Sequence, residues 1–144
     1  MLVKELMSPD PVCCAPDTPL RKVAQLMAEN DCGAIPVCEQ RHVVGIVTDR
    51  DIVTRGFLKG TDPQTLPASD VMTRNLMTVQ EDDSLEHALR IMEAEQVRRL
   101  PVTQGPVLVG MLSMTDLADH LPERKAGELL REVSSRPRNA RFAL

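Results

Sequence analysis

One sequence pattern occurs twice in this 144-residue chain, and its two copies stand 65 residues apart without a gap. The matched positions are mainly the apolar residues, prolines and glycines on which packing depends. They are Met7 and Met72, Leu20 and Leu85, Met27 and Met92, Pro36 and Pro101, Val37 and Val102, Gly45 and Gly110, and Asp51 and Asp116. A repeat of fixed period indicates one supersecondary unit used twice. Because a unit of this size buries little apolar surface alone, we expect the copies to pack together about a pseudo-twofold axis, with a ligand-sized cleft between them.

Each copy predicts the element order β-α-β-β-α and therefore a mixed α/β (α+β) fold. A short helical turn ending in methionine leads into an extended stretch, and a helix follows with apolar residues at i, i+3, i+4 and i+7. A strand that carries a proline, a buried strand and a second helix complete the unit. The second helices are expected to begin near Asp49 and Met114. Thr18, followed by a proline, predicts one helix cap, and Asp83 with Glu86 predicts a capping box at its counterpart.

The pattern also predicts how the chain is divided. The expected segments are a first repeat over 1–58, a linker over 59–67, a second repeat over 68–121, and a C-terminal helix and tail over 122–144. Glycine and prolines mark the linker. In the C-terminal helix, Leu129, Leu130 and Val133 are expected to form the apolar face.

Composition excludes several classes of function. The chain has two Phe, no Trp and no Tyr, and its formal net charge is −4. Single-stranded nucleic acid binding usually relies on aromatic stacking and positive charge, so we expect no nucleic acid partner. No apolar run is long enough for a membrane span, and the N-terminus lacks the apolar segment of a signal peptide. The sequence therefore predicts a cytoplasmic protein without a membrane partner.

The cysteines all lie in the first repeat, and none recurs in the second. They are Cys13, Cys14, Cys32 and Cys38. Their spacing does not match the paired pattern of a structural zinc site, so we expect no metal. Two interpretations stay open: buried apolar thiols, or a disulfide or redox pair between Cys13 and Cys38.

The residues with the most chemical potential lie where the second strand of each copy meets its second helix. The segments 45–51 and 110–116 both fit Gly-apolar-x-Thr/Ser-x-x-Asp. The pattern is typical of a capping box. It also suits a nucleotide, because a helix N-terminus attracts phosphate, the hydroxyl adds a donor, the carboxylate accepts from ribose hydroxyls, and glycine admits a ligand close to the strand. Two copies in register favour the ligand-binding interpretation.

These features together resemble a tandem CBS-domain pair, or Bateman module. The resemblance rests on the β-α-β-β-α unit, the paired junctions, the strand prolines and the leading turns, and it covers Val3 to about Leu121. Within the family, segments 48–53, 96–102 and 119–123 are similar to the stand-alone bacterial hypoxic response protein type. The resemblance implies a regulatory protein of a stress response, with no attached catalytic domain, and a flat, disc-like homodimer.

The family implies two clefts that bind adenosine-containing ligands such as AMP, ADP, ATP or S-adenosylmethionine. At one site, Thr48 would lie near phosphate, Asp51 on ribose and Ile46 beside the base. Met77 and Val97 from the other repeat would complete its pocket.

The second site would be built in the same way, from Ser113, Asp116 and Met111, with Val12 and Cys32 completing the pocket. Arg98 lies where the family often has a phosphate-binding cation, and the first repeat has Gly33 there instead. The two sites are therefore expected to differ, and the Ser113/Asp116/Arg98 site is the one favoured for a phosphorylated ligand. A solvated surface role for Arg98 stays open. Arg50 has two interpretations, a phosphate contact or an ion pair with a neighbouring aspartate.

The sequence thus predicts a non-enzymatic ligand sensor that requires no cofactor, since it contains no recognisable catalytic constellation. Apolar residues of the second helices favour a homodimer; they are Ile52, Val53, Phe57 and Leu117. The alternative is a ligand-free interaction scaffold whose clefts are filled by its own side chains, possibly redox-responsive through Cys13 and Cys38. The downstream partner and the identity of the ligand are not encoded in any motif.

Overall fold

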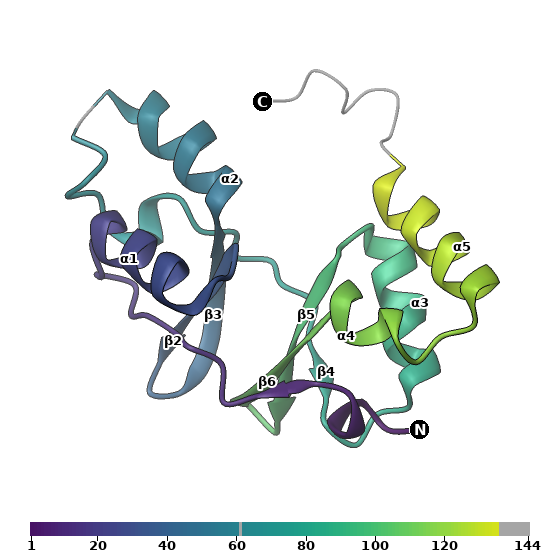
Figure 1. The fold of residues 1–144 in the computed structure, drawn as a ribbon. Helices are drawn as coiled ribbons and strands as arrows, with labels where there is room; N and C mark the ends of the chain where they lie inside the picture. The colour runs from purple at the N-terminus through teal and green to yellow at the C-terminus, as the bar shows by residue number, and fades with distance from the viewer. Residues whose placement is uncertain (61, 136–144) are drawn as a thin grey trace. The chain divides into compact units, whose positions relative to one another are not determined.

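The structure is a computed structural model, and it describes residues 1–60 and 62–135 (Figure 1). The chain forms two compact units that are not continuous in sequence. Unit 1 contains Met1–Asp10, Met77–Gly105 and the described residues from Val109 onward, and unit 2 contains Pro11–Leu76 and Pro106–Leu108. Each unit therefore combines the helices and strands of one repeat with the leading turn of the other. The segment boundaries predicted from the sequence, after residues 58, 67 and 121, divide the chain by repeat and not by compact unit. They stay predictions.

Unit 2 is built on the antiparallel hairpin of β2 (Ala34–Glu39) and β3 (His42–Thr48). Helix α1 (Leu20–Asn30) precedes the hairpin, and α2 (Asp49–Asp51) follows it and continues as the π-helical η2 (Ile52–Gly56) and the 3-10 turn η3 (Phe57–Lys59). The leading turn of the second repeat, η4 (Ala68–Asp70), packs here. The expected first strand of this copy is reduced to a single bridge between Cys14 and Val37.

Unit 1 has the full β-α-β-β-α order. Strand β4 (Val79–Gln80) runs parallel to β5 (Arg99–Gln104), and β6 (Val107–Ser113) lies beside β5. Helix α3 (Leu85–Glu95) follows β4, and α4 (Met114–Ala118) follows β6. The first residues of the chain belong to this unit, because η1 (Val3–Glu5) packs in its core and β1 (Ser8–Pro9) pairs with β6. Helices α1 and α3, and strands β2 and β5, keep the 65-residue offset of the repeat.

As far as the structure describes the chain, both cores lack aromatic side chains. The core of unit 2 joins α1 to the hairpin through Val23, Ile35 and Val47. The core of unit 1 joins α3 to β5 through Met92 and Leu100. Among the described residues, no helix combines the length and the apolar character that a membrane crossing requires.

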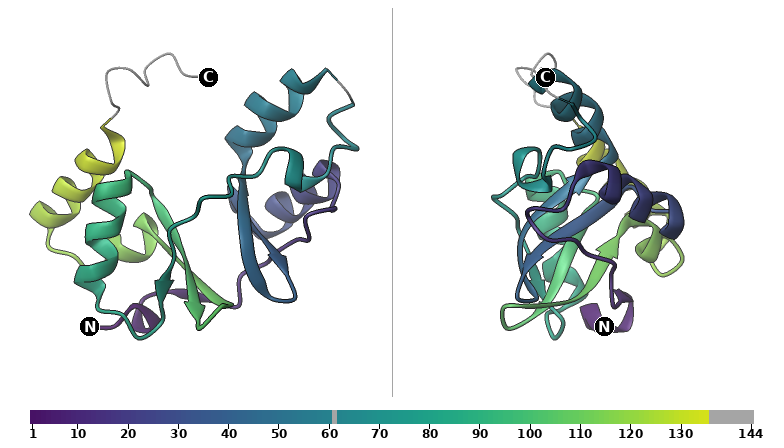
Figure 2. Two further views of the ribbon diagram at one scale, coloured as in Figure 1. Left: turned by 180° about the vertical axis from the view of Figure 1, so that it is seen from behind. Right: turned by 90° about the vertical axis from the view of Figure 1, so that its left-hand side faces the viewer.

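The C-terminal helix α5 (Glu123–Ser134) packs against α3 and α4 of unit 1 (Figure 2). Leu129 and Val133 are buried there, but Leu130 is 50% exposed, so the prediction that Leu130 belongs to the buried face was wrong. The α5 helix also buries Leu117 completely. Leu117 is therefore not part of an open apolar face, whereas Val53 and Phe57 of unit 2 are exposed.

Two of the predicted caps were also wrong. The N-cap of α1 is Pro19, while the Thr18 hydroxyl instead accepts a hydrogen bond from the Ala15 N–H. The N-cap of α3 is Ser84, whose hydroxyl accepts from the N–H three residues on. The Asp83 carboxylate accepts from the Gln80 N–H and so closes the preceding turn. In both cases the polar side chain stabilises the turn before the helix rather than the helix itself.

The repeated strand glycines serve packing. A Cβ atom at Gly45 would lie 2.5 Å from the Met72 sulfur, and one at Gly110 would lie 2.5 Å from the Met7 sulfur. Each strand therefore leaves room for the methionine that ends a leading turn. The backbone carbonyl oxygens of Thr73 and Ser8 would lie 3.0 Å and 3.1 Å from these Cβ atoms. The expectation that these glycines admit a ligand was wrong, because the space beside them is filled by the chain itself.

Candidate ligand-binding junctions

In unit 2, the strand-to-helix junction is a complete capping box. The Thr48 hydroxyl accepts from the Asp51 N–H at 3.1 Å, and the Asp51 carboxylate accepts from the Thr48 N–H at 2.9 Å. The remaining Asp51 oxygen faces the Arg55 guanidinium at 3.9 Å, and Asp51 is only 9% exposed. The capping interpretation of this motif is thus confirmed, and one carboxylate oxygen keeps a long, weak contact.

Arg50 was expected either to contact phosphate or to pair with a neighbouring aspartate. Within the described part of the chain its guanidinium forms no ion pair, and Asp51 pairs with Arg55 instead. The Arg50 N–H donates to the Asp49 carboxylate at 2.8 Å, and the Arg50 carbonyl accepts from the Thr54 hydroxyl at 2.8 Å. The ion-pair interpretation of Arg50 was therefore wrong, and the phosphate interpretation stays a prediction.

In unit 1, the same capping box carries an additional bond. The Ser113 hydroxyl accepts from the Asp116 N–H at 3.3 Å, and one Asp116 oxygen accepts from both the N–H and the hydroxyl of Ser113 at 2.8 Å. The other Asp116 oxygen accepts from the Ser8 hydroxyl at 3.0 Å. Both oxygens of this carboxylate are thus occupied by hydroxyl or amide donors of the chain.

Ser8 was missed by the sequence analysis. It follows Met7, a residue matched in the repeat, and its counterpart Thr73 follows Met72. This match in the repeat was the available sequence signal. In the structure, the leading turn of one copy packs on the strand glycine of the other. Only the pairing of Ser8 with Met111 on β6, however, brings its hydroxyl to Asp116.

The charges beside the two junctions are opposite. In unit 1, the Met114 N–H donates to the Arg98 carbonyl, and the Arg98 guanidinium is exposed and donates to the Ser134 hydroxyl of α5 at 3.1 Å. In unit 2, the Asp49 N–H donates to the Gly33 carbonyl in the matching way. A Cβ atom at Gly33 would lie 3.1 Å from an Asp49 carboxylate oxygen. In unit 2, the Asp49 carboxylate thus lies beside Gly33, the position that carries the Arg98 guanidinium in unit 1.

The apolar residues of the predicted pockets are divided between the units. Val12, Cys32 and Ile46 belong to unit 2, and Met77, Val97 and Met111 belong to unit 1. Ile46 is buried and pairs with Thr73, whereas Cys32 and Met77 are exposed. The assignment of these residues to two adenosine pockets stays a prediction.

Three of the four cysteines lie near one another in unit 2. Burial, and after it the neighbouring Cys13, raises the pKa of the Cys38 thiol to about 12. Burial likewise raises the pKa of Cys14 to about 11, against a hydrogen bond with Thr18 that lowers it. All four thiols are free, and Cys13 is exposed. The predicted proximity of Cys13 and Cys38 is consistent with this arrangement, and their oxidation stays a prediction.

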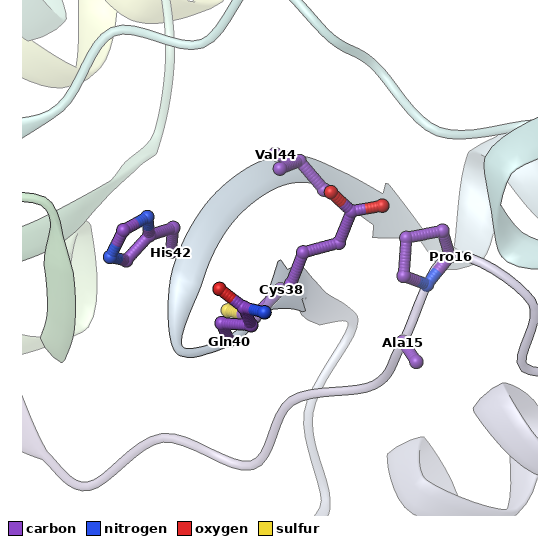
Figure 3. A pocket seen from close by; sticks show the side chains of 7 residues that line it. Ala15, Pro16, Cys38, Gln40, His42 and Val44 are labelled. Atoms are coloured by element: carbon purple, nitrogen blue, oxygen red, sulfur yellow. The ribbon is translucent and has the colours of Figure 1, made fainter.

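Two cavities within unit 2 were not predicted. One, of about 570 Å³, lies at the turn of the β2–β3 hairpin and is lined by the residues that Figure 3 labels together with Glu39. The other, of about 450 Å³, lies between α1 and the helix that follows β3, beside Phe57. Neither is lined by a residue of the predicted nucleotide sites. Within the described ranges, no group of three or more His, Cys, Asp or Glu side chains is placed to hold a metal ion.

Comparison with known proteins gives the same family for both copies. The CBS domain model matches residues 3–56 and 68–123. Hypoxic response protein 1 of Mycobacterium tuberculosis is 35% identical over 133 residues, which cover 92% of this chain and 93% of that protein. The CBS domain-containing protein YhcV of Bacillus subtilis is 38% identical over 133 residues, with 92% and 94% covered.

Solved structures agree with this fold. The crystal structure of Hypoxic Response Protein I with two coordinated zinc ions has a TM-score of 0.77 and 36% identity, and covers 85% of this chain and 100% of that one. The CBS domain pair of protein MJ0100, solved with 5′-methylthioadenosine and S-adenosyl-L-methionine, has a TM-score of 0.72 at 22% identity, with 83% and 94% covered. The described residues do not fit a zinc site, because their ligand-type side chains form no suitable cluster.

Proposed function

Because this chain belongs to the CBS-domain family, as the match of the family model over both repeats shows, we propose that it is a non-enzymatic regulatory module that binds adenosine-containing ligands at its strand-to-helix junctions. The observation that carries the proposal is the pair of junction carboxylates, Asp51 and Asp116, each held by a capping box with one oxygen turned to a partner that a ligand can replace. A ribose diol donates to such an oxygen as a serine hydroxyl does.

The unit 1 junction is proposed to bind the phosphorylated ligand. Arg98 supplies a guanidinium there that is exposed and held only by the Ser134 hydroxyl. A phosphate oxygen is a stronger acceptor for a guanidinium than a neutral hydroxyl, because the bond joins opposite charges. Ser113 adds a hydroxyl one turn from Asp116. Phosphate binding at this junction therefore exchanges a weak bond within the chain for a charge-assisted one.

The unit 2 junction is proposed to bind adenosine-containing ligands without a phosphate. The Asp49 carboxylate lies beside Gly33, on the side where Arg98 extends in the other copy. Among the described residues no cation pairs with Asp49, so its charge opposes a phosphate group. The two ligands of the MJ0100 pair, 5′-methylthioadenosine and S-adenosyl-L-methionine, lack a phosphate as well.

The proposal is tested first on purified protein. Because the chain has no Trp or Tyr, its absorbance at 280 nm is almost nil, and a copurified adenine compound stands out at 260 nm. The protein is extracted and the absorbing compound is identified by mass spectrometry. We expect a stoichiometric adenosine derivative, or nucleotide binding in a subsequent titration. Absence of both would contradict the proposal and support a ligand-free scaffold.

A homodimer is proposed as the assembled form. Val53, Phe57 and Leu58 are at least 62% exposed on one helical stretch of unit 2, and large apolar side chains exposed close together in this way favour an interface. The α3–α4 side of unit 1, in contrast, is covered by α5. Light scattering on the wild type and on Phe57→Lys tests this. We expect a dimer that dissociates in the variant, and a monomeric wild type would contradict it.

A redox response is the second candidate function. Cys13 is exposed and lies next to the buried Cys38, so an oxidant reaches Cys13 first and Cys38 is positioned to resolve the oxidised product into a disulfide. A count of free thiols before and after mild peroxide treatment tests it. The number of free thiols is expected to fall by two in the wild type. In Cys13→Ser, which lacks one partner of the disulfide, we expect no such fall. An unchanged count in the wild type would exclude this function.

A further inference from the structure

Arg98 connects the ends of two helices, α4 and α5, which lie side by side in unit 1 (Figure 1). Its carbonyl accepts a hydrogen bond from the N–H of Met114, the first residue of α4. Its guanidinium donates to the hydroxyl of Ser134, the last residue of α5, at 3.1 Å. A cation is favourable at this end of a helix, because the helix dipole places partial negative charge there. One residue thus stands both at the ligand junction and at the end of α5.

The end of α5 has few other attachments to unit 1. Val133 is buried in the core, and Ser134 and Ser135 after it are exposed. The N–H and the hydroxyl of Ser135 both donate to the Arg131 carbonyl, which belongs to α5 itself. Within the part of the chain that the structure describes, the bond to Arg98 is the only hydrogen bond that joins Ser134 or Ser135 to a residue outside α5. The last turn of α5 therefore depends on the Arg98 guanidinium for its polar contact with unit 1.

A ligand phosphate would compete with Ser134 for this guanidinium. Both residues are exposed, and Arg98 forms no ion pair with any residue that the structure describes. A phosphate oxygen is charged and a serine hydroxyl is neutral, so the phosphate is the stronger acceptor, and the planar guanidinium can bind it through two N–H groups. The phosphate contact proposed above therefore removes the hydrogen bond that holds the end of α5.

The cation and the helix that it holds occur in the same copy of the repeat. Gly33 stands in unit 2 where unit 1 has Arg98. In the described chain of unit 2, α2 is followed by η2 and η3, and no helix takes the place that α5 has in unit 1. Unit 1 thus combines a free-standing guanidinium at its junction with a helix end that this guanidinium contacts, and it is the unit proposed to bind a phosphorylated ligand.

We propose that a ligand phosphate at the unit 1 junction releases the last turn of α5 by taking the Arg98 guanidinium from Ser134. The inference rests on the proposed function and adds how binding is transmitted to another part of the chain. Leu129 stays buried, so the release is confined to the C-terminal end of the helix. Because coupling between two contacts is reciprocal, loss of the Ser134 hydroxyl should in turn favour the phosphate. An adenosine ligand without a phosphate leaves the Arg98–Ser134 contact in place.

The contact is tested first without any ligand, on ¹⁵N-labelled full-length protein. The ¹⁵N–¹H nuclear Overhauser effect of the Ser135 amide reports the order of the last turn. Arg98→Ala removes the guanidinium, so this value is expected to fall at Ser135 and to stay unchanged at Leu129, whose side chain is buried. Arg99→Ala, which removes the same charge at the next residue, is the matched control. An unchanged value at Ser135 in Arg98→Ala overturns the proposal, whether or not a nucleotide binds.

AMP and adenosine then test the role of the phosphate. Saturating AMP is expected to lower the Ser135 value of the wild type as Arg98→Ala does, and adenosine is expected to leave it unchanged. Ser134→Ala removes the competing hydroxyl, so it is expected to bind AMP about threefold more tightly, in line with the loss of one hydrogen bond, and to bind adenosine as the wild type does. Ser135→Ala is the control, because the Ser135 hydroxyl donates to the Arg131 carbonyl within α5.

Failure of this inference and failure of the proposed function give different results. If AMP binds and the Ser135 value does not fall, or if Ser134→Ala binds AMP no more tightly than the wild type, the release of α5 is overturned and the proposed function stands. If AMP does not bind at all, the proposed phosphate site is overturned and the release by phosphate with it.

Discussion

The two strand-to-helix junctions have the same backbone and different chemistry. Both are capping boxes at the end of a strand, with an aspartate one turn into the helix. In unit 1 the surroundings are a guanidinium and the Ser8 hydroxyl, and in unit 2 they are the Asp49 carboxylate and the Arg55 guanidinium. Under the proposed function, the repeat places the two ligand-binding junctions, and the side chains that do not repeat give each junction its own ligand preference.

The two units also differ in how far other parts of the chain cover their helices. In unit 1, α5 packs over α3 and α4 and buries Leu117. In unit 2 the matching residue, Ile52, is only partly buried, and it lines the 450 Å³ cavity. One copy of the repeat thus has its helices covered by α5, and the other leaves Val53, Phe57 and Leu58 exposed.

The largest effect is expected from removing the contact that α5 makes with unit 1. Leu129→Ala should lower the free energy of unfolding by about 3 kcal/mol, because Leu129 is 1% exposed and its loss opens a core cavity. Leu130→Ala, at the next residue, should change it little, because Leu130 is 50% exposed. Urea denaturation of both variants measures this. Equal losses would mean that α5 does not cover unit 1 as described.

The strand glycines should show what the two units share. Gly45→Ala and Gly110→Ala are each expected to cost about 1–3 kcal/mol, because the added methyl overlaps a methionine side chain. Combining Gly110→Ala with Met7→Ala should recover part of the loss, as a double-mutant cycle would reveal. Should only one glycine be sensitive, the two leading turns would not be equivalent.

Arg98 should determine the preference for phosphate. Arg98→Gln is expected to weaken AMP binding about tenfold, or about 1.4 kcal/mol, and to leave adenosine binding unchanged. Arg99→Gln is the matched control, because it removes the same charge at the next residue, where β5 begins. Calorimetric titration gives both affinities. A loss of AMP affinity in the Arg99 variant alone would move the phosphate site to the other face of the strand.

Ser8 should compete with the ligand at Asp116. Ser8→Ala removes the hydroxyl that donates to the outer Asp116 oxygen, so adenosine should bind several-fold more tightly, in line with about 0.5–1.5 kcal/mol for one hydrogen bond. Thr73→Val, at the matching residue of unit 2, serves as the control and should leave the affinity unaltered. Weaker binding in Ser8→Ala would show instead that the serine supports the site.

The thiols should give the smallest effect near neutral pH. Folding raises the pKa of Cys14 to about 11 and of Cys38 to about 12, above the ordinary value of 9.0. The unfolded thiols therefore ionise first, and stability that is fully present below pH 9 should be lost progressively as the pH rises toward 11 to 12. Urea midpoints from pH 7 to 10 test this. Cys38→Thr, which copies Thr103, should flatten the profile; an unchanged profile would exclude Cys38 as a source.

The sequence was sufficient to predict the parts of the fold that repeat. The 65-residue offset is kept by α1 and α3 and by β2 and β5, because the same apolar spacing produces the same packing twice. It also identified the capping residues Thr48 and Ser113, whose role is local. It misplaced the caps at Thr18 and Asp83, because a polar side chain can stabilise either a helix start or the turn before it.

The remaining features depend on contacts that a linear pattern does not specify. Ser8 reaches Asp116 only because the first residues of the chain pack on the second repeat. The burial of Leu129 and the exposure of Leu130 depend on how α5 rotates against α3. The cavity at the β2–β3 turn is lined by Ala15 and Pro16, which stand where the other copy has Gln80 and Glu81. Each of these features involves residues that depart from the repeat. Their structural effect, however, depends on the neighbouring elements that they contact.

The most direct test of the account compares AMP with adenosine by calorimetry in Asp51→Asn and Asp116→Asn, since asparagine keeps an oxygen for the cap and removes the charge. With the unit 1 junction intact, in Asp51→Asn, AMP should bind at least tenfold more tightly than adenosine. With only the unit 2 junction intact, in Asp116→Asn, adenosine should bind as well as AMP or better. The same preference for AMP in both variants would contradict the claim that the two junctions bind different ligands.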